Sequence, residues 1–98
     1  MVRLRPEAGI DRDTVITRLC EAGIGTSVHF IPLHRHPVWR DERIDHRAAF
    51  PNAEAGFASM ISLPLYTKMS DADQQRVITA LTTALGTAPT PALAGAAA

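Results

Sequence analysis

Hydrophobic and polar positions change their spacing along the chain, and each change predicts a different element. Val2 and Leu4 alternate with arginines ahead of Pro6, a two-residue period that predicts a short strand. The spacing then lengthens to the helical period, because four apolar residues fall on one side of a helix that would face a sheet. That stripe consists of Val15, Ile16, Leu19 and Cys20. The first elements are therefore predicted to be a strand and a helix.

Residues with strong conformational preferences mark both ends of this helix. The Asp11 carboxylate is placed to accept a hydrogen bond from an early backbone N–H group and so to cap the first turn. Gly23 tolerates a positive φ without steric cost, and Ile24 after it is placed to contact Leu19. The helix is expected to end just before Gly23.

A second alternating run follows this glycine. It predicts a strand over residues 26–30, with Val28 and Phe30 on one face and His29 on the other. Pro32 has no backbone N–H to donate to a neighbouring strand, so pairing is expected to stop there. The predicted strand therefore leads directly into a proline-interrupted segment that contains more histidines.

The middle of the chain predicts an irregular segment and a helix. Residues 37–51 mix charged residues with Trp39 and show no clear period, which is typical of a loop that carries binding groups on a scaffold. Asn52 is placed to cap the helix that follows. The predicted buried stripe of that helix consists of Ala53, Phe57, Met60 and Ile61. A short extended run through Leu63 is expected next.

The last helix has the clearest signature. Ser70 and Asp73 have the spacing of a capping box, in which each residue satisfies a free backbone N–H group of the other. Gly86 stands where a terminating glycine belongs. The apolar stripe between them consists of Val77, Ile78, Leu81 and Leu85.

This order of elements predicts one α/β domain over residues 1–86. We expect a small two-layer sandwich of about three short strands with helices on one face. Residues 87–98 hold only alanine, proline, glycine, threonine and one leucine, which is too little apolar surface to offset the entropy of ordering. That tail is expected to be disordered.

Composition narrows the classes of partner. Ten basic and ten acidic residues give a formal net charge of zero, which offers no electrostatic footprint for nucleic acid or an anionic membrane surface. No run approaches the roughly 18 apolar residues of a membrane span. Cys20 is the only cysteine, so no intrachain disulfide can form and a cytoplasmic location is expected.

The order of several short motifs is more specific than any one of them. Residues 23–34 read GIGTSVHFIPLH, residues 51–54 read PNAE, and residues 61–66 read ISLPLY. Over about residues 2–85 this order strongly resembles the C-terminal domain of the DegT/DnrJ/EryC1/StrS aminotransferases. Those are enzymes that use pyridoxal phosphate (PLP) to act on nucleotide-linked keto sugars. The resemblance implies a fold like the small C-terminal domain of aspartate-aminotransferase-type enzymes.

The resemblance also implies a substrate-binding role for His29, Phe30, Pro32 and His34, since this segment lies near the active site in the family. Phe30 stands where the family often has tyrosine, so stacking stays available while the hydroxyl contact is lost. His29 is suited to donating a hydrogen bond to a sugar hydroxyl or phosphate oxygen, and the alternative is that it bonds to backbone and fixes the loop. The same alternative holds for His34.

Neither a catalytic nor a cofactor-binding residue is predicted within the chain. In the family, the lysine that forms a Schiff base with PLP and the acidic partner of the pyridine nitrogen belong to the large domain. Lys68 is the only lysine here, and its setting ahead of the Ser70 cap predicts a solvated side chain and not a nucleophile. PLP is therefore expected in the full-length family enzyme and not on this chain alone.

Partners follow from this division of roles. The expected partners are a large PLP-binding domain or a homodimer partner, with a nucleotide sugar as substrate of the complete enzyme. The chain would then be a fragment or a separate small subunit that forms part of the substrate-site wall and the subunit interface. The alternative is a non-catalytic interaction module that pairs with a large domain or with itself, with Trp39 and Tyr66 as packing or interface residues.

Two further groups of side chains receive a structural interpretation. His29, His34, His36 and His46 fit no compact zinc template, so a metal-binding module is the weakest alternative and no metal ligand is predicted. Arginines share residues 35–47 with aspartate and glutamate, which is typical of a solvated, salt-bridged loop. These arginines are Arg35, Arg40, Arg43 and Arg47, and the alternative for one of them is a clamp on a phosphate group.

Overall fold

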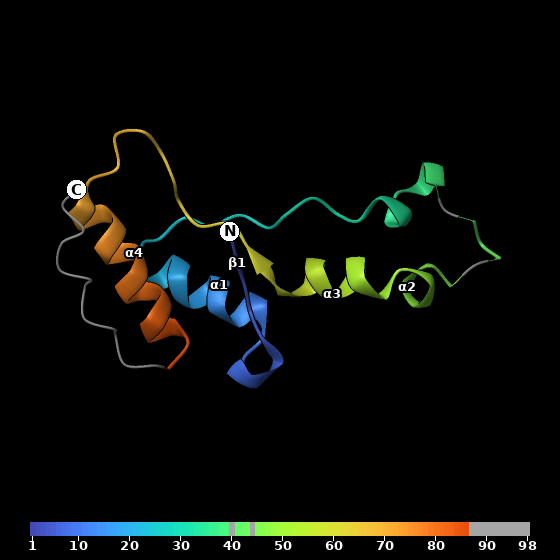
Figure 1. The fold of residues 1–98 in the computed structure, drawn as a ribbon, viewed down its shortest axis with the longest axis horizontal. Coiled ribbons are helices and arrows are strands. Elements are labelled where there is room, and N and C mark those ends of the chain that lie inside the picture. The colour runs from blue at the N-terminus through green and yellow to red at the C-terminus, as the bar shows by residue number, and fades with distance from the viewer. Residues whose placement is uncertain (40, 44, 87–98) are drawn as a thin grey trace, which may run out of the picture.

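The structure, a computed structural model, describes residues 1–39, 41–43 and 45–86. The tail predicted for residues 87–98 lies outside this range. Four α-helices and two short strands follow one another in the described chain, with 3₁₀ turns between them (Figure 1). The architecture is mixed α/β, as predicted, although its sheet is smaller than expected.

The first helix, α1, spans Arg12–Glu21 and is bounded as its sequence predicts. The Asp11 carboxylate accepts a hydrogen bond from the backbone N–H of Thr14 at 2.9 Å. Gly23 has a φ of +75°, and the backbone N–H of Ile24 donates to the carbonyl of Leu19 at 2.9 Å. This bond closes the helix end and brings Ile24 into the same buried cluster as Leu19.

The sheet differs from the prediction. Strand β1, Val2–Arg3, pairs antiparallel with β2, Met60–Ile61, so that Val2 lies opposite Ile61. The strand predicted over residues 26–30 contributes a single bridge, between Ser27 and Ser62. A longer ladder has no partner, because a helix runs directly into β2 on one side and Pro64 lacks an N–H on the other. The expected three-stranded sandwich is therefore a two-stranded sheet with one added bridge.

The core lies where α1, β2 and the last helix meet. The last helix, α4, spans Asp71–Ala84, and its capping box between Ser70 and Asp73 is present. Val15, Leu19, Ile24, Ile61, Val77 and Ala84 form the buried cluster. On the predicted stripes of α1 and α4, two residues are exposed, namely Cys20 and Ile78. Both lie at the margin of their stripe, where a 100° step per residue turns the side chain out of the contact.

An arginine of α1 binds the C-terminal end of α4, and an arginine of α4 binds the C-terminal end of α1. Arg18 of α1 donates to the carbonyl of Ala84 at 2.7 Å, and Arg76 of α4 donates to the carbonyl of Ala22 at 3.3 Å. A cation near a helix C-terminus also interacts favourably with the helix dipole. The two helices therefore satisfy each other's last carbonyls.

The middle of the chain forms two helices, and the second begins earlier than predicted. A short helix, α2, spans His46–Ala49, and α3 spans Pro51–Ser59. Phe50 is the cap residue of α3 and Pro51 is its first residue, so the predicted Asn52 cap is wrong. Proline suits this position because its missing N–H would have no partner in the first turn. Of the predicted stripe only Ile61 is buried, while Ala53 is exposed.

Residues 28–39, 41–43 and 45–59, which include α2 and α3, form a projection that we call the arm. In Figure 1 it extends away from α1 and α4. The radius of gyration is 16.8 Å, against about 13 Å for a compact domain of this length. The arm also carries most of the exposed large apolar side chains: Val28, Phe30, Ile31, Leu33, Val38, Trp39 and Phe50. Exposed apolar side chains gathered on one projection are typical of an interaction surface.

The difference between Leu19 and Cys20 gives a direct test of the core. Leu19→Ala should lower the free energy of unfolding by about 2–5 kcal/mol, because it removes a fully buried side chain and leaves a cavity. Cys20→Ala should change it by no more than about 0.5 kcal/mol, because the thiol is exposed. Urea unfolding followed by circular dichroism measures both. Equal losses in the two variants would contradict the helix orientation described here.

Candidate functional site

The predicted substrate-binding segment runs along the arm beside α3 (Figure 1). His29 and Phe30 are exposed, and the Phe30 side chain has 87% of its surface open to solvent. Their rings meet edge to face with 5.9 Å between centroids. Neither side chain is packed into the core, so both are available to a ligand or a partner.

A 3₁₀ turn over Leu33–Arg35 changes the direction of the chain after Pro32. The backbone N–H of Arg35 donates to the Pro32 carbonyl at 2.9 Å, and that of His36 donates to the Leu33 carbonyl at 3.1 Å. The turn directs the side chains of His34 and Arg35 towards α3. His34 is the one buried polar or charged residue in the described chain.

Both side chains meet the carboxylate of Glu54 on α3. His34 Nε2 lies 2.6 Å from Glu54 Oε1, and Arg35 Nε donates to the same oxygen at 2.8 Å. Arg35 Nη2 donates to Oε2, so the arginine grips both oxygens. An ionised carboxylate only accepts hydrogen bonds, which assigns the Nε2 proton to His34. We call this set of three side chains the Glu54 clamp.

The clamp sets the charge state of its carboxylate. Hydrogen bonds from Arg35, and secondly from His34, lower the pKa of Glu54 from its usual 4.5 to about 2. Glu54 is therefore ionised at all physiological pH values. A lowered pKa stabilises the folded chain above pH 4.5, and this contribution is lost as the pH falls from 4.5 towards 2.

Aromatic rings surround the clamp and connect it to the core. The His34 ring stacks on Phe50 with 4.9 Å between centroids and 23° between planes. The Arg35 guanidinium lies 5.0 Å from the centre of the Phe57 ring, and that of Arg12 lies 5.1 Å from it. Arg12 also donates to the Phe57 carbonyl. Since Arg12 belongs to α1, this ring joins the arm to the core.

A mainly apolar pocket of about 570 Å³ opens between the turn and α2 and α3. Pro32 and His34 line it together with Trp39 and Phe50. His29 and Phe30 are not among its lining residues. The structure thus brings two of the four predicted site residues to one pocket and leaves the other two on the open surface of the arm.

Glu54 and Arg35 were not predicted as site residues. Arg35 was interpreted as a solvated loop charge, but only 30% of its side chain is exposed and it pairs with Glu54. That interpretation does describe Arg43, which pairs with Asp41 at 3.0 Å with 89% of its own side chain exposed. The available signal for Glu54 was its place in the PNAE motif, whose four letters belong to the pattern of the resemblance.

The described residues give no support to a metal site or a membrane span. Within the described residues, no three histidine, cysteine or acidic side chains gather closely enough to hold a metal ion, and the His46 side chain lies outside the description. None of the described helices combines the length and apolarity needed to cross a bilayer. Trp39 and Tyr66 are exposed and not packed in the core.

Comparison with known proteins identifies relatives of the chain. The family model described as the DegT/DnrJ/EryC1/StrS aminotransferase family matches residues 1–82. The spore coat polysaccharide biosynthesis protein SpsC of Bacillus subtilis is 47% identical over 76 residues, which is 76% of this chain and 20% of SpsC. The uncharacterized protein MJ1066 of Methanocaldococcus jannaschii is 47% identical over 72 residues, 74% of this chain and 19% of that protein. The chain thus spans about a fifth of the length of the curated relatives it matches.

The described residues do not fit PLP, the cofactor used by that family. A Schiff base requires a lysine held in a desolvated pocket or beside another cation. Lys68, the only lysine of the sequence, is exposed in the turn that closes with a hydrogen bond from the Met69 N–H to the Tyr66 carbonyl. No step of amino transfer can therefore be derived from this chain's own side chains.

The Glu54 clamp predicts an unusual titration. In the wild-type chain, the carboxyl carbon of Glu54 should titrate with a midpoint near 2 by NMR. Arg35→Gln should move that midpoint towards 4.5, and His34→Gln should move it less, because Arg35 is the larger cause of the shift. Arg43→Gln, which breaks an exposed pair elsewhere on the arm, is the matched control and should leave it in place. An unmoved midpoint in Arg35→Gln would refute the clamp.

Proposed function

The chain belongs to the DegT/DnrJ/EryC1/StrS aminotransferase family, and from this membership we propose that it acts as the C-terminal small domain of a PLP-dependent sugar aminotransferase. It would form part of the wall of a site for a nucleotide-linked keto sugar and part of the interface with a large domain or second subunit. The observation that best supports this is the Glu54 clamp, which joins the PLH and PNAE motifs of the chain in space. The name of SpsC, a polysaccharide biosynthesis protein, supports a sugar as substrate.

Each proposed site residue has a role that suits its position. The exposed imidazole of His29 would donate a hydrogen bond to a sugar hydroxyl or a phosphate oxygen. Phe30 would contribute a ring face for packing without a hydroxyl contact. Pro32 and His34 would shape the turn and act through it, because His34 is already engaged with Glu54. His34 is thus proposed as a positioning residue, while His29 and Phe30 would touch the ligand.

The chemistry would come from the remainder of the enzyme. PLP supplies an electron sink for amino transfer when it is bound by a family enzyme. Lys68 offers no desolvated amine for it, so a large domain must provide the Schiff-base lysine. We therefore propose that this chain alone does not transaminate and that it works either as a separate small subunit or as one piece of a longer protein. A cytoplasmic setting suits its single cysteine.

The exposed apolar surface of the arm favours a second candidate. The exposed fractions of Phe30, Val38 and Trp39 are 87%, 84% and 62%, values that side chains of this size rarely have together on an isolated domain. A module that pairs through the arm, with a large domain or with a second copy, would cover them. This function needs no substrate contact at His29.

A chimaera tests the proposed function. In a family aminotransferase with an assayable nucleotide-sugar substrate, the segment matching residues 1–82 is replaced by that of this chain. We expect amino transfer to be retained. His29→Ala in the chimaera should raise KM by about ten-fold, since a hydrogen bond to a charged or polar substrate group is lost.

The control is Ile78→Ala, which changes a half-exposed side chain on α4, outside the arm. It should leave KM and kcat unchanged. A chimaera that binds PLP and is folded yet fails to transfer an amino group would contradict the proposed function. An equal rise in KM in both variants would remove His29 from the substrate site.

Sedimentation tests the second candidate. Without a large domain, the arm of one copy should pair with that of another, and the full chain should sediment as a dimer or larger species. Leu33→Ser with Trp39→Ser should shift it to a monomer, because both side chains are exposed on the arm. Leu65→Ser, which changes an even more exposed leucine outside the arm, is the control and should not. A monodisperse wild-type monomer would argue against pairing through the arm.

A further inference from the structure

Residues 28–31 form an exposed stretch whose backbone has no hydrogen-bond partner. Val28, Phe30 and Ile31 are 44%, 87% and 54% exposed, and His29 is exposed as well. Within the described residues, none of the four backbone N–H groups and none of the four carbonyls of this stretch takes part in a hydrogen bond. Each of these groups is therefore open to another polypeptide.

This stretch continues the edge of the sheet. Immediately before it, Ser27 and Ser62 exchange both of their backbone hydrogen bonds, at 3.1 and 2.9 Å. Shortly after it, the His34 ring contacts Glu54 of α3. The stretch is thus fixed near both ends and runs beside α3, as Figure 1 shows. One of its edges faces α3, and no described element lies beyond the other.

The composition of the stretch favours pairing with another strand. Valine, isoleucine and phenylalanine are enriched in strands. Natural edge strands are usually protected from pairing by charged side chains or by a proline within them. Residues 28–31 contain no lysine, arginine, acidic residue or proline, and Pro32 ends the stretch after four residues. Nothing in the stretch itself therefore opposes a partner strand.

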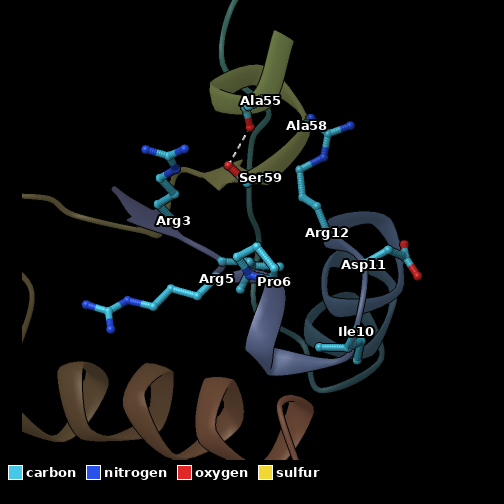
Figure 2. Close-up of a pocket in the computed structure, with 10 residues that line it drawn as sticks. Arg3, Arg5, Pro6, Ile10, Asp11, Arg12, Ala55, Ala58 and Ser59 are labelled. Carbon is cyan, nitrogen blue, oxygen red and sulfur yellow. Dashed lines mark hydrogen bonds between the residues drawn. The ribbon is translucent and has the colours of Figure 1, made fainter. Parts of the chain in front are cut away.

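The opposite edge of the sheet, at β1, has such protection. Arg3 lies in β1, Arg5 follows it, and Pro6 ends this extended segment. Figure 2 shows the side chains of Arg3 and Arg5 extending away from Arg12 into the space around the strand. A second β1 laid beside the first would bring like charges together. The contrast between the two edges identifies residues 28–31 as the edge that is open to a partner.

We propose that the edge formed by residues 28–31 pairs antiparallel with the same edge of a second copy of this chain. The inference rests on the second candidate function, pairing through the arm, and names the backbone contact that forms it. None of the four residues is proline, so a second copy supplies as many carbonyls as N–H groups, and no fixed charge opposes the contact. Two-fold symmetry places identical strands antiparallel. Because the other edge faces α3, the assembly closes at two copies.

Amide hydrogen exchange on the full chain tests the pairing directly. In a paired strand the N–H groups of alternate residues point to the partner. Exchange at two alternate amides of residues 28–31 should therefore slow by about ten-fold at a chain concentration where nine copies in ten are paired, while the other two amides keep their rate. Sedimentation at the same concentrations measures the paired fraction.

Two results of this measurement overturn the inference and differ in what else they remove. A dimer in which residues 28–31 exchange as they do in the monomer would leave pairing through the side chains of the arm, such as Leu33 and Trp39, and would refute the strand contact. A chain that stays monomeric at every concentration would refute the second candidate function as well. Neither result bears on the proposed role in a sugar aminotransferase.

Proline substitution separates the backbone from the side chains. Val28→Pro with Ile31→Pro removes one N–H from each edge of the stretch, because the two positions are an odd number of residues apart. Neither N–H has a partner within a single copy, so the fold should be kept. The dimer should dissociate about ten-fold more readily or more, because hydrogen bonds between the copies are lost.

Val28→Thr with Ile31→Thr is the matched control. Threonine is also β-branched and keeps both N–H groups, while its hydroxyl makes the stretch less apolar. This variant should dimerise within about three-fold of the wild-type chain. An equal loss in the threonine and proline variants would assign the contact to side chains and overturn the inference, as would a proline variant that dimerises like the wild type. If the proline variant fails to fold, the exchange pattern of the wild-type chain decides.

Discussion

The order of the arm depends on the carboxylate of Glu54, because the arm has no apolar core of its own. Between Ile24 and Ile61, His34 is the only buried residue in the described part of the chain. A carboxylate removed from water is stable only when its oxygens are hydrogen-bonded, and here Arg35 and His34 supply those bonds. The turn after Pro32 and the first part of α3 are thus joined by charge and not by apolar burial, and the surface that carries His29 and Phe30 is positioned by this joint.

The Phe57 ring extends this control to the rest of the molecule. Arg35 of the clamp and Arg12 of α1 both lie over it, so one aromatic side chain connects the clamp in the arm to α1. Cation–π contacts of this kind contribute about 0.5–1 kcal/mol at exposed sites and more when water is excluded. The arm is therefore held at its base while its outer apolar residues remain uncovered, which is the arrangement expected of a surface that meets another polypeptide.

Both ends of α1 and the start of α4 were predicted correctly from the sequence. The Asp11 cap, the Gly23 stop and the Ser70 capping box were all correctly placed, because each depends on residues within one helical turn. The strand predicted over residues 26–30 forms only one bridge, because pairing depends on the length of a partner more than thirty residues away and β2 has only two residues. The prediction that Cys20 is buried is wrong, because Cys20 lies at the margin of its apolar stripe. The ion pair of Arg35 and Glu54 joins residues 19 positions apart, which no local pattern reveals, although Glu54 lies within the PNAE motif. The roles of His29 and Phe30 stay predictions.

The reciprocal arginines of α1 and α4 make the ends of these two helices independent of the outer arm. Each helix completes the other's final carbonyls, at Ala84 and Ala22, without help from anything between Ile24 and Ile61. These two contacts connect α1 and α4 directly, whereas the arm meets α1 through Arg12 and Phe57. A substitution in the outer part of the arm, away from Phe57, therefore leaves both helix ends with their hydrogen-bond donors.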